Sequence, residues 1–333
     1  MKFKLFSAVV LGLASLVLAT GCNNKKELWI YTSLYKEVIA EMEPLLKAAI
    51  PEAEIKWFQG GSENVAGKVN AELAGGKTKA DLILTSDPFW YQELKQSGKL
   101  LAYDSAATKD VPSELKDPDH AFVTVRIPLM VMAYHSESLQ PDQLPKSWKD
   151  LTLPRFNKKL SMGSPLESGT SFTAVALLSR LLGWDYFKDL RKQDLVAAGG
   201  NSSVITRIET REKILGVVLL ENILKAQAKG SPVKAIYPED GSIPVPSPIA
   251  IMKSTQNPEV AKKIVDWFFS EAAQRAIVKG GMYSPLDKIE SPVNAKPWAE
   301  VKRQMLPWNS KILAELFSSR DQIKTQFSEI IAH

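Results

Sequence analysis

The sequence predicts an α/β protein with two lobes, each an open, mostly parallel sheet flanked by helices, joined by two hinge crossings. Three observations predict this fold. Strand-like and helix-like segments alternate from Leu28 onward. A second region of the same kind follows a strand-rich segment from Ala121 to Tyr134. An extended stretch with three prolines, Ile243 to Met252, then returns the chain to the first region.

Composition narrows the class of protein. The chain has 333 residues, 45% hydrophobic and 24% charged, which is ordinary globular usage and excludes a disordered, collagenous or coiled-coil protein. One cysteine and three histidines leave no internal disulfide and no cysteine-rich zinc site. The 42 basic and 37 acidic residues are interspersed, so nucleic acid is not an expected partner. We expect no metal and no cofactor.

The first 21 residues have the pattern of an export signal. Lys2 and Lys4 precede an uncharged apolar run, Leu5 to Leu18, that is too short to span a bilayer comfortably. Small residues and Cys22 follow. This resembles the bacterial lipoprotein signal, in which the cysteine is lipidated and becomes the first residue, although Ala19 stands where leucine is usual. The alternative is a plain secretory signal with an incidental cysteine.

The first lobe is expected to comprise residues 28–122 and 248–333, after a lipidated tether at 22–27. Apolar runs between turn residues predict its strands, and amphipathic runs predict its helices. Pro44 is expected to kink or restart the first helix. The predicted elements are strands at 28–31, 53–58 and 81–84, helices at 34–50, at 63–73 and after Pro88, a long amphipathic helix at 258–278, and one or two helices at 308–331.

The second lobe is expected at 123–247. The same patterns predict its elements. Asn201-Ser202-Ser203, after the Gly199-Gly200 turn, is a further candidate anion contact, with Ser202 at its centre, and the alternative is a plain loop. The predicted elements are strands at 159–162, 215–220 and 233–237, and helices at 168–182 and 184–195.

Small hydroxyl residues and glycines gather at the predicted strand-to-helix turns of both lobes. In open sheets these turns line the ligand crevice, and helix N-termini there favour an anion. For each single residue, the alternative is an ordinary helix cap. The candidates are Thr32, Ser33, Gly61, Ser62, Ser86, Ser168, Gly169 and Thr170.

Several segments together resemble one family, the type II solute-binding proteins of ABC importers. Within this family, the segments are most similar to those of the branch that contains ferric-ion, phosphonate and sugar-phosphate receptors. The resemblance implies the two-lobe, type II periplasmic-binding-protein-like fold, closure on a solute, delivery to an inner-membrane ABC permease, and no covalent chemistry. We place the hinge near 122–128 and 243–250, and expect an exported monomer anchored by lipid, in the periplasm or on the outer face of the cytoplasmic membrane. The matching segments are 29–33, 80–88, 168–173, 230–241 and 257–262.

The same resemblance bears on the ligand. Ferric-ion members usually offer a histidine, a glutamate and two adjacent tyrosines, and these positions fall on Tyr35, Ser86 and the pair Glu221–Asn222. No Tyr-Tyr pair occurs in the chain, so a ferric ion is the alternative ligand and not the preferred one. A small anionic solute is the preferred hypothesis, either a phosphonate or an organophosphate such as an aminoalkylphosphonate or a sugar phosphate. Glu221 would hold an amine or hydroxyls, unless it is a surface carboxylate.

One enzyme hypothesis competes with the receptor hypothesis. Ser33 and Lys36 fit S-x-x-K, the nucleophile motif of penicillin-binding enzymes, but the supporting S-D-N and K-T-G elements are absent. Asp117, Asp119 and His120 resemble a metal cluster, although Asp-Pro-Asp-His favours a turn. The sequence therefore favours a binding protein over an exported serine acyl-enzyme.

Overall fold

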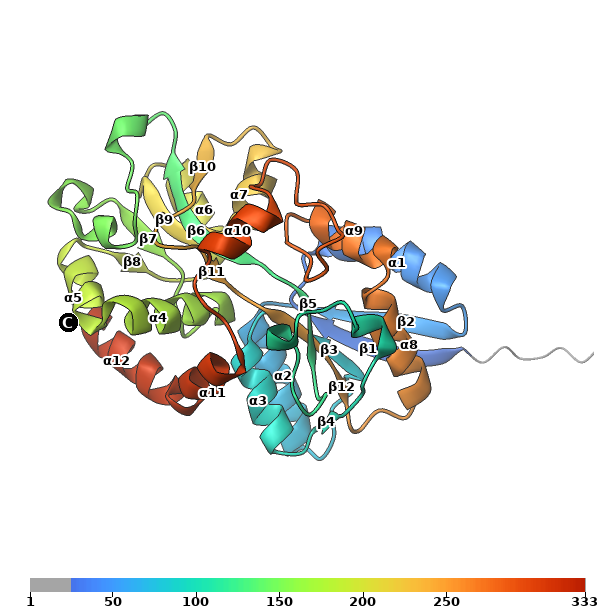
Figure 1. Cartoon of the computed structure of the whole chain (residues 1–333). Coiled ribbons are helices and arrows are strands. Elements are labelled where there is room, and N and C mark those ends of the chain that lie inside the picture. The colour runs from blue at the N-terminus through green and yellow to red at the C-terminus, as the bar shows by residue number, and fades with distance from the viewer. Residues whose placement is uncertain (1–24, 333) are drawn as a thin grey trace, which may run out of the picture.

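The computed structural model describes residues 25–332. The predicted signal peptide and the lipidation site Cys22 lie outside the described residues. Two lobes lie side by side, each built around its own six-stranded sheet (Figure 1). Across residues 25–332, no helix is both long and apolar enough to cross a membrane.

The sheet of the first lobe joins strands from both ends of the chain. β1 pairs in parallel with β2 and β3, and β12 is antiparallel to β3, β4 and β5. The predicted two-lobe fold is confirmed, but the sheet is mixed because the returning strand β12 enters it in the opposite direction. The strands are β1 (Lys26–Thr32), β2 (Ala53–Gln59), β3 (Leu82–Leu84), β4 (Leu100–Leu101), β5 (Val123–Arg126) and β12 (Ser247–Met252).

The second sheet repeats this design. β7 pairs in parallel with β8 and β9, and the long strand β6 is antiparallel to β9, β10 and β11. The strands are β6 (Leu129–His135), β7 (Leu160–Met162), β8 (Val196–Ala197), β9 (Leu215–Leu219), β10 (Val233–Ile236) and β11 (Ile243–Pro244).

Two neighbouring crossings connect the sheets. The chain leaves the first sheet after β5 and enters β6 through Ile127 and Pro128, and it returns from β11 to β12 through Val245 and Pro246. The Val245 amide donates to the Pro128 carbonyl at 2.9 Å, so the crossings lie side by side. Both fall inside the predicted hinge ranges.

Helices cover both lobes. α1, α2, α3, α8 and α9 pack on the first lobe, and α4 to α7 pack on the second. The bounds are α1 (Lys36–Ala49), α2 (Ser62–Ala74), α3 (Pro88–Gln96), α4 (Gly169–Leu182), α5 (Trp184–Lys192), α6 (Asn201–Glu209), α7 (Leu220–Gln227), α8 (Pro258–Phe268), α9 (Glu271–Lys279), α10 (Trp298–Gln304), α11 (Ser310–Ser318) and α12 (Arg320–Ala332).

Three local predictions need correction. α1 continues through Pro44, so the helix does not restart there, and buried Met42 and Leu46 pack on the core on both sides of the proline. The single helix expected at 258–278 is two helices, since Ser270 breaks the run and caps α9 by accepting a hydrogen bond from the Ala273 amide. The loop expected at Ser202 is the start of α6.

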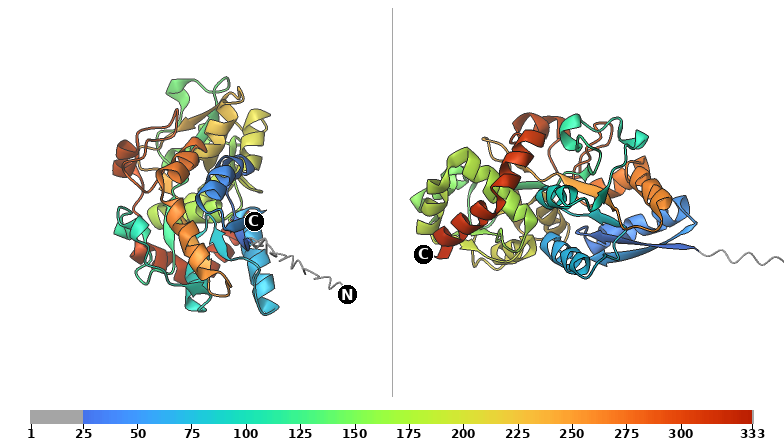
Figure 2. Two further views of the ribbon diagram at one scale, coloured as in Figure 1. Left: turned by 90° about the vertical axis from the view of Figure 1, so that its right-hand side faces the viewer. Right: turned by 90° about the horizontal axis from the view of Figure 1, so that it is seen from below.

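The predicted lobe boundaries also differ from the structure at two segments. β5 pairs with β12 of the first sheet, although residue 123 was assigned to the second lobe. α12 packs on α4 and α5 of the second lobe, although the tail was assigned to the first. The reason is apolar: Phe327 is buried against Phe187, with ring centroids 5.4 Å apart. α11 and α12 thereby form a strap along both lobes (Figures 1 and 2).

Candidate functional site

A buried arginine lies between the lobes at the end of β5. Arg126 is 2% exposed, and its Nη2 donates to Ser86 Oγ at 2.9 Å and to Ser33 Oγ at 3.0 Å. Its Nη1 contacts Met282 Sδ at 3.0 Å, and its Nε has no partner. Burial lowers the pKa of the guanidinium, whereas the nearby Glu221 raises it. Within residues 25–332 this buried cation forms no ion pair within 4 Å; its hydrogen-bonding partners are neutral.

Two serine hydroxyls contact the guanidinium, and two more serines, from separate elements, join this cluster through Ser86. Ser33 follows β1, Ser86 follows β3, Ser62 begins α2 and Ser247 begins β12. The Ser86 amide donates to the hydroxyls of Ser33 and Ser62, each at 3.2 Å, and Ser247 Oγ donates to Ser86 Oγ at 2.9 Å. The parallel strands β1 and β3 end at the same edge of the sheet, which brings Ser33 and Ser86 together, and Ser62 at the start of α2 joins them.

The second lobe touches this cluster through Gly169 at the start of α4. A Cβ placed on Gly169 would lie 2.9 Å from Asp87 Cβ, 3.1 Å from the Ser86 carbonyl oxygen and 3.3 Å from Ser62 Cβ. The two lobes are therefore in contact here at a distance that only glycine permits.

The hydroxyl of Thr170 is used inside the second lobe. It accepts from Asn201 Nδ2 at 2.9 Å and lies 3.0 Å from Ser168 Oγ. Asn201 Oδ1 in turn accepts from the Leu219 amide at 3.2 Å. Within the predicted anion contact Asn201-Ser202-Ser203, the Asn201 side chain contacts Thr170 and the Leu219 amide, whereas Ser202 is exposed.

Helix capping explains few of the predicted hydroxyls. Ser168 caps α4 by accepting from the Ser171 amide at 3.3 Å. The Thr32 hydroxyl is consumed by the turn after β1, where it donates to the Leu84 carbonyl and accepts from the Leu34 amide. Gly61 is exposed at the start of α2 and offers only backbone. Ser33, Ser62 and Ser86 cap no helix, which leaves their hydroxyls to the cluster.

A second polar group lies between α1 and α7. The Tyr35 hydroxyl, on the first lobe, donates to Asn222 Oδ1 on the second at 2.9 Å. Glu221 is 2% exposed and its Oε2 has no partner, so the surface-carboxylate alternative is wrong. Burial raises the pKa of Glu221 to about 7, partly offset by a backbone hydrogen bond and by Arg126. Burial, followed by the charge of Glu221, raises the pKa of Tyr35.

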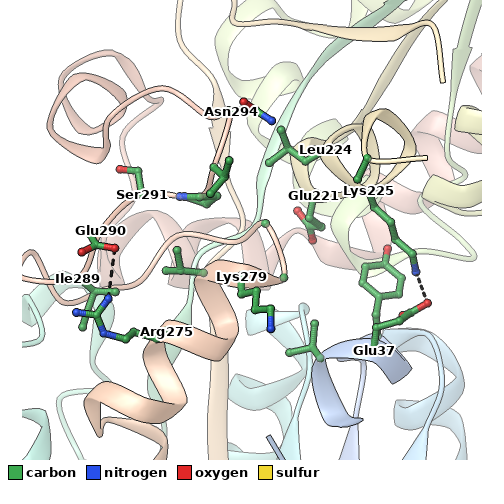
Figure 3. A pocket seen from close by; sticks show the side chains of 18 of the residues that line it. Glu37, Glu221, Leu224, Lys225, Arg275, Lys279, Ile289, Glu290, Ser291 and Asn294 are labelled. Atoms are coloured by element: carbon green, nitrogen blue, oxygen red, sulfur yellow. Dashed lines mark hydrogen bonds and ion pairs between the residues drawn. The ribbon is translucent and has the colours of Figure 1, made fainter. Parts of the chain in front are cut away.

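A pocket of about 570 Å³ opens beside this second group, between α1, α7, α9 and the loop at 289–294 (Figure 3). Tyr35 and Glu221 are among the residues that line it. Its apolar lining includes Val38, Leu224, Val278 and Ile289, and its charged lining comprises Glu37, Lys225, Lys229, Arg275, Lys279 and Glu290.

These groups do not make a good metal site. In the part of the chain that the structure describes, no three His, Cys, Asp or Glu residues cluster as metal ligands would. The positions matched to the iron ligands supply one phenol and one carboxyl, beside a guanidinium. Asp117 accepts from the Asp119 and Ala121 amides and pairs with Lys95, as expected of a turn.

The acyl-enzyme hypothesis lacks its base. Lys36 is exposed, whereas the Ser33 hydroxyl contacts Arg126 and Ser86. A guanidinium donates and does not accept, so it cannot remove the proton of a nucleophilic serine.

The sequence reasoning missed Arg126 and Ser247. Arg126 is the one charged residue in the run from Phe122 to Tyr134, and it lies inside the predicted hinge. A charge within an apolar strand is a signal that burial and a function coincide.

Comparison with known proteins relates this geometry to a family. The sequence profile of the bacterial extracellular solute-binding proteins matches residues 77–310. The "Probable ABC transporter periplasmic-binding protein y4fP" of Sinorhizobium fredii is 26% identical over 289 residues, 79% of each chain.

Two solved structures share the fold. Iron-bound HitA from Pseudomonas aeruginosa has a TM-score of 0.80 at 19% identity and covers 91% of this chain and 99% of its own. AfuA from Actinobacillus pleuropneumoniae, with fructose-6-phosphate bound, has a TM-score of 0.80 at 20% identity and covers 92% and 99%. With the family profile matching well over half of the sequence, the chain belongs to the bacterial extracellular solute-binding proteins.

Proposed function

We propose that this protein is the solute-binding component of an ABC importer. It captures a small organophosphate or phosphonate anion between its lobes and delivers it to an inner-membrane permease. The single observation that carries the proposal is Arg126, a buried guanidinium held by serine hydroxyls and without an ion-pair partner among the described residues.

A buried charge is costly unless an opposite charge and hydrogen bonds compensate it. A phosphate group supplies both, because its oxygens accept two parallel hydrogen bonds from a guanidinium and further bonds from hydroxyls. Ser33, Ser62 and Ser86 are placed to donate, and the helix N-termini at α2 and α4 favour the same sign of charge. The fructose-6-phosphate bound to AfuA and the similarity to a probable ABC transporter periplasmic-binding protein of S. fredii support this proposal.

Iron is the weaker alternative. HitA shares the fold and is iron-bound, but hard ferric ligands are scarce here, and Arg126 would repel a trivalent cation across a short, poorly screened distance. A ferric solution that produced a visible charge-transfer band with the protein would favour iron over phosphate.

The test is calorimetric titration of the mature protein with phosphate, phosphonates, sugar phosphates, sulfate, polyamines and Fe(III). Arg126→Met keeps the apolar stem and removes the charge. It is expected to weaken binding of the best anion by about 10- to 100-fold, the range of a lost charged hydrogen bond. Arg180→Met, on the exposed face of α4, is the control and should bind as the wild type. Equal affinity of Arg126→Met and wild type would contradict the proposal.

The predicted lipid anchor and the monomeric state belong to the same proposal. Metabolic labelling with a fatty acid should mark the wild type and spare Cys22→Ser. Labelling of both proteins, or of neither, would contradict an anchor at this cysteine.

A further inference from the structure

We infer that Gln274, on α9, is a positioning residue for the anion site. It holds the backbone on either side of Arg126 and so directs the guanidinium toward Ser33 and Ser86. The inference rests on the proposed function, since it takes Arg126 as the group that binds the anion. Gln274 acts through Arg126 and is not expected to contact the solute.

The Gln274 side chain is fully buried, and both N–H groups and the oxygen of its amide are hydrogen-bonded. Nε2 donates to the Phe268 carbonyl at 2.7 Å and to the Val125 carbonyl at 3.1 Å, and Oε1 accepts from Ser284 Oγ at 2.6 Å. Because the two carbonyls can only accept, the amide has one possible orientation. Gln274 therefore joins the end of α8, the strand β5 and the segment after α9.

Val125 is an irregular position in β5. The pairing with β12 shifts by one residue between Thr124 and Arg126, which leaves Val125 as an extra residue without a partner in that register. An extra residue of this kind bends the strand and redirects the side chain beside it. Gln274 bonds the carbonyl of this extra residue, so it stabilises the bend from which the Arg126 side chain leaves the strand.

The backbone after Arg126 is held from the same side. Ile127 and Tyr283 exchange two backbone hydrogen bonds, at 2.8 and 3.2 Å. The next residue is Ser284, whose buried hydroxyl donates to Gln274. One buried amide therefore fixes the backbone before the arginine directly, and the backbone after it through this segment.

The position of the guanidinium matters because its hydrogen bonds are directional. Arg126 Nη2 lies 3.0 Å from Ser33 Oγ and 2.9 Å from Ser86 Oγ, and a small displacement of β5 would lengthen both bonds. A planar guanidinium also binds an oxyanion through two parallel bonds in one orientation only. Loss of the Gln274 amide should therefore weaken anion binding although every residue of the cluster is still present.

The first experiment replaces the amide. Gln274→Met keeps the length of the side chain and removes its hydrogen bonds. With inorganic phosphate, glycerol 3-phosphate and 2-aminoethylphosphonate as probes, titration calorimetry should show about a tenfold loss of affinity. Gln227→Met is the matched control, because Gln227 Nε2 also donates to a strand carbonyl, that of Val233, at 3.0 Å, but in the second lobe. It should bind the probes within about twofold of the wild type.

The second experiment separates positioning from a general structural role by repeating Gln274→Met in the Arg126→Met background. Once the guanidinium is gone there is nothing to position, so the additional loss should stay within about twofold. The shift of the unfolding midpoint at a high concentration of probe extends the comparison to weak binders. An equal loss, about tenfold in both backgrounds, would overturn the inference.

Ser284→Ala serves if Gln274→Met does not fold, because it removes one of the hydrogen bonds and leaves the glutamine in place. It should weaken anion binding about threefold, and wild-type affinity would then overturn the inference. If Arg126→Met loses affinity and folded Gln274→Met does not, the inference fails and the proposed function stands. If Arg126→Met binds as the wild type, or if no anion binds, both fail.

Discussion

The two ends of the space between the lobes are built differently. At the α4 end, Gly169 meets Ser86 and Ser62 so closely that no side chain fits between them. At the α7 end, the lobes meet through side chains, such as Tyr35 with Asn222 and Lys225 with Glu37, beside the pocket. Backbone contacts have fixed dimensions, whereas side chains reorient. The α4 end is therefore fixed by backbone contact, whereas the α7 end can change through its side chains.

The strap adds to this difference. Arg320 at the start of α12 donates to Asp87 at 2.9 Å, and Asp87 caps α3 beside the Gly169 contact. Phe172 of α4 packs edge-on against Phe89 of α3 at 5.0 Å. The α4 end is thus held by charge and aromatic packing.

The largest expected effect comes from widening the α4 end. Gly169→Val places atoms where Asp87 and Ser86 already lie, so the lobes cannot meet, and anion affinity should fall by more than about 100-fold. Titration calorimetry measures it. Gly67→Ala, at a glycine of α2 with no atom within 4 Å of the added Cβ, is the control and should bind normally. Normal binding by Gly169→Val would show that closure does not need this contact.

The next effect is on stability. Arg320→Ala leaves the Asp87 carboxylate, 1% exposed, without its cation, and should lower the free energy of unfolding by about 2 kcal/mol. Arg275→Ala breaks two exposed pairs with Glu271 and Glu290 and should change it by less than about 0.5 kcal/mol. Urea unfolding measures both. Equal effects of the two substitutions would show that the Arg320–Asp87 pair stabilises the protein no more than an exposed ion pair does.

At the α7 end, Glu221 should make the free energy of unfolding depend on pH. The pKa of Glu221 is about 7 in the folded protein against 4.5 ordinarily, so between these values the folded state binds more protons than the unfolded one. Stability of the ligand-free protein should therefore fall as pH rises through this window and then level off. Glu221→Gln should abolish that loss, on the order of 1–2 kcal/mol because water entering between the lobes reduces the burial penalty.

Urea unfolding at pH 4.5 to 8 measures this difference. Glu290→Gln, an exposed carboxyl at the same pocket, is the control and should track the wild type. Parallel curves for wild type and Glu221→Gln would contradict the burial of this carboxyl.

The smallest expected effect separates Ser168, which caps α4, from the exposed Ser202. Ser168→Ala removes the cap of α4 and should cost about 1 kcal/mol of stability. Ser202→Ala, on the exposed face of α6, should alter neither stability nor anion affinity. A loss of affinity in Ser202→Ala would restore its role as an anion contact.

Local sequence patterns were enough to predict the two α/β lobes, the crossings near Pro128 and Pro246, and the strand ends that carry Ser33 and Ser86. These follow from local information, namely hydrophobic periodicity, prolines and turn residues. The sequence also indicated Glu221 and Asn222, through the resemblance to a family, but left Glu221 undecided between cleft and surface.

Which of these groups come together depends on long-range packing. Arg126 is close to Ser33 and Ser86 because β5 pairs with β12 beside β3, a long-range pairing that no local pattern states. The same holds for α12. Its amphipathic sequence does not identify the lobe on which it packs, and in the structure Phe327 packs on Phe187 of the second lobe. Whether a charged side chain is buried depends on every element packed around it. The sequence therefore shows that Arg126 lies in an apolar run, but it does not show which residues surround the guanidinium.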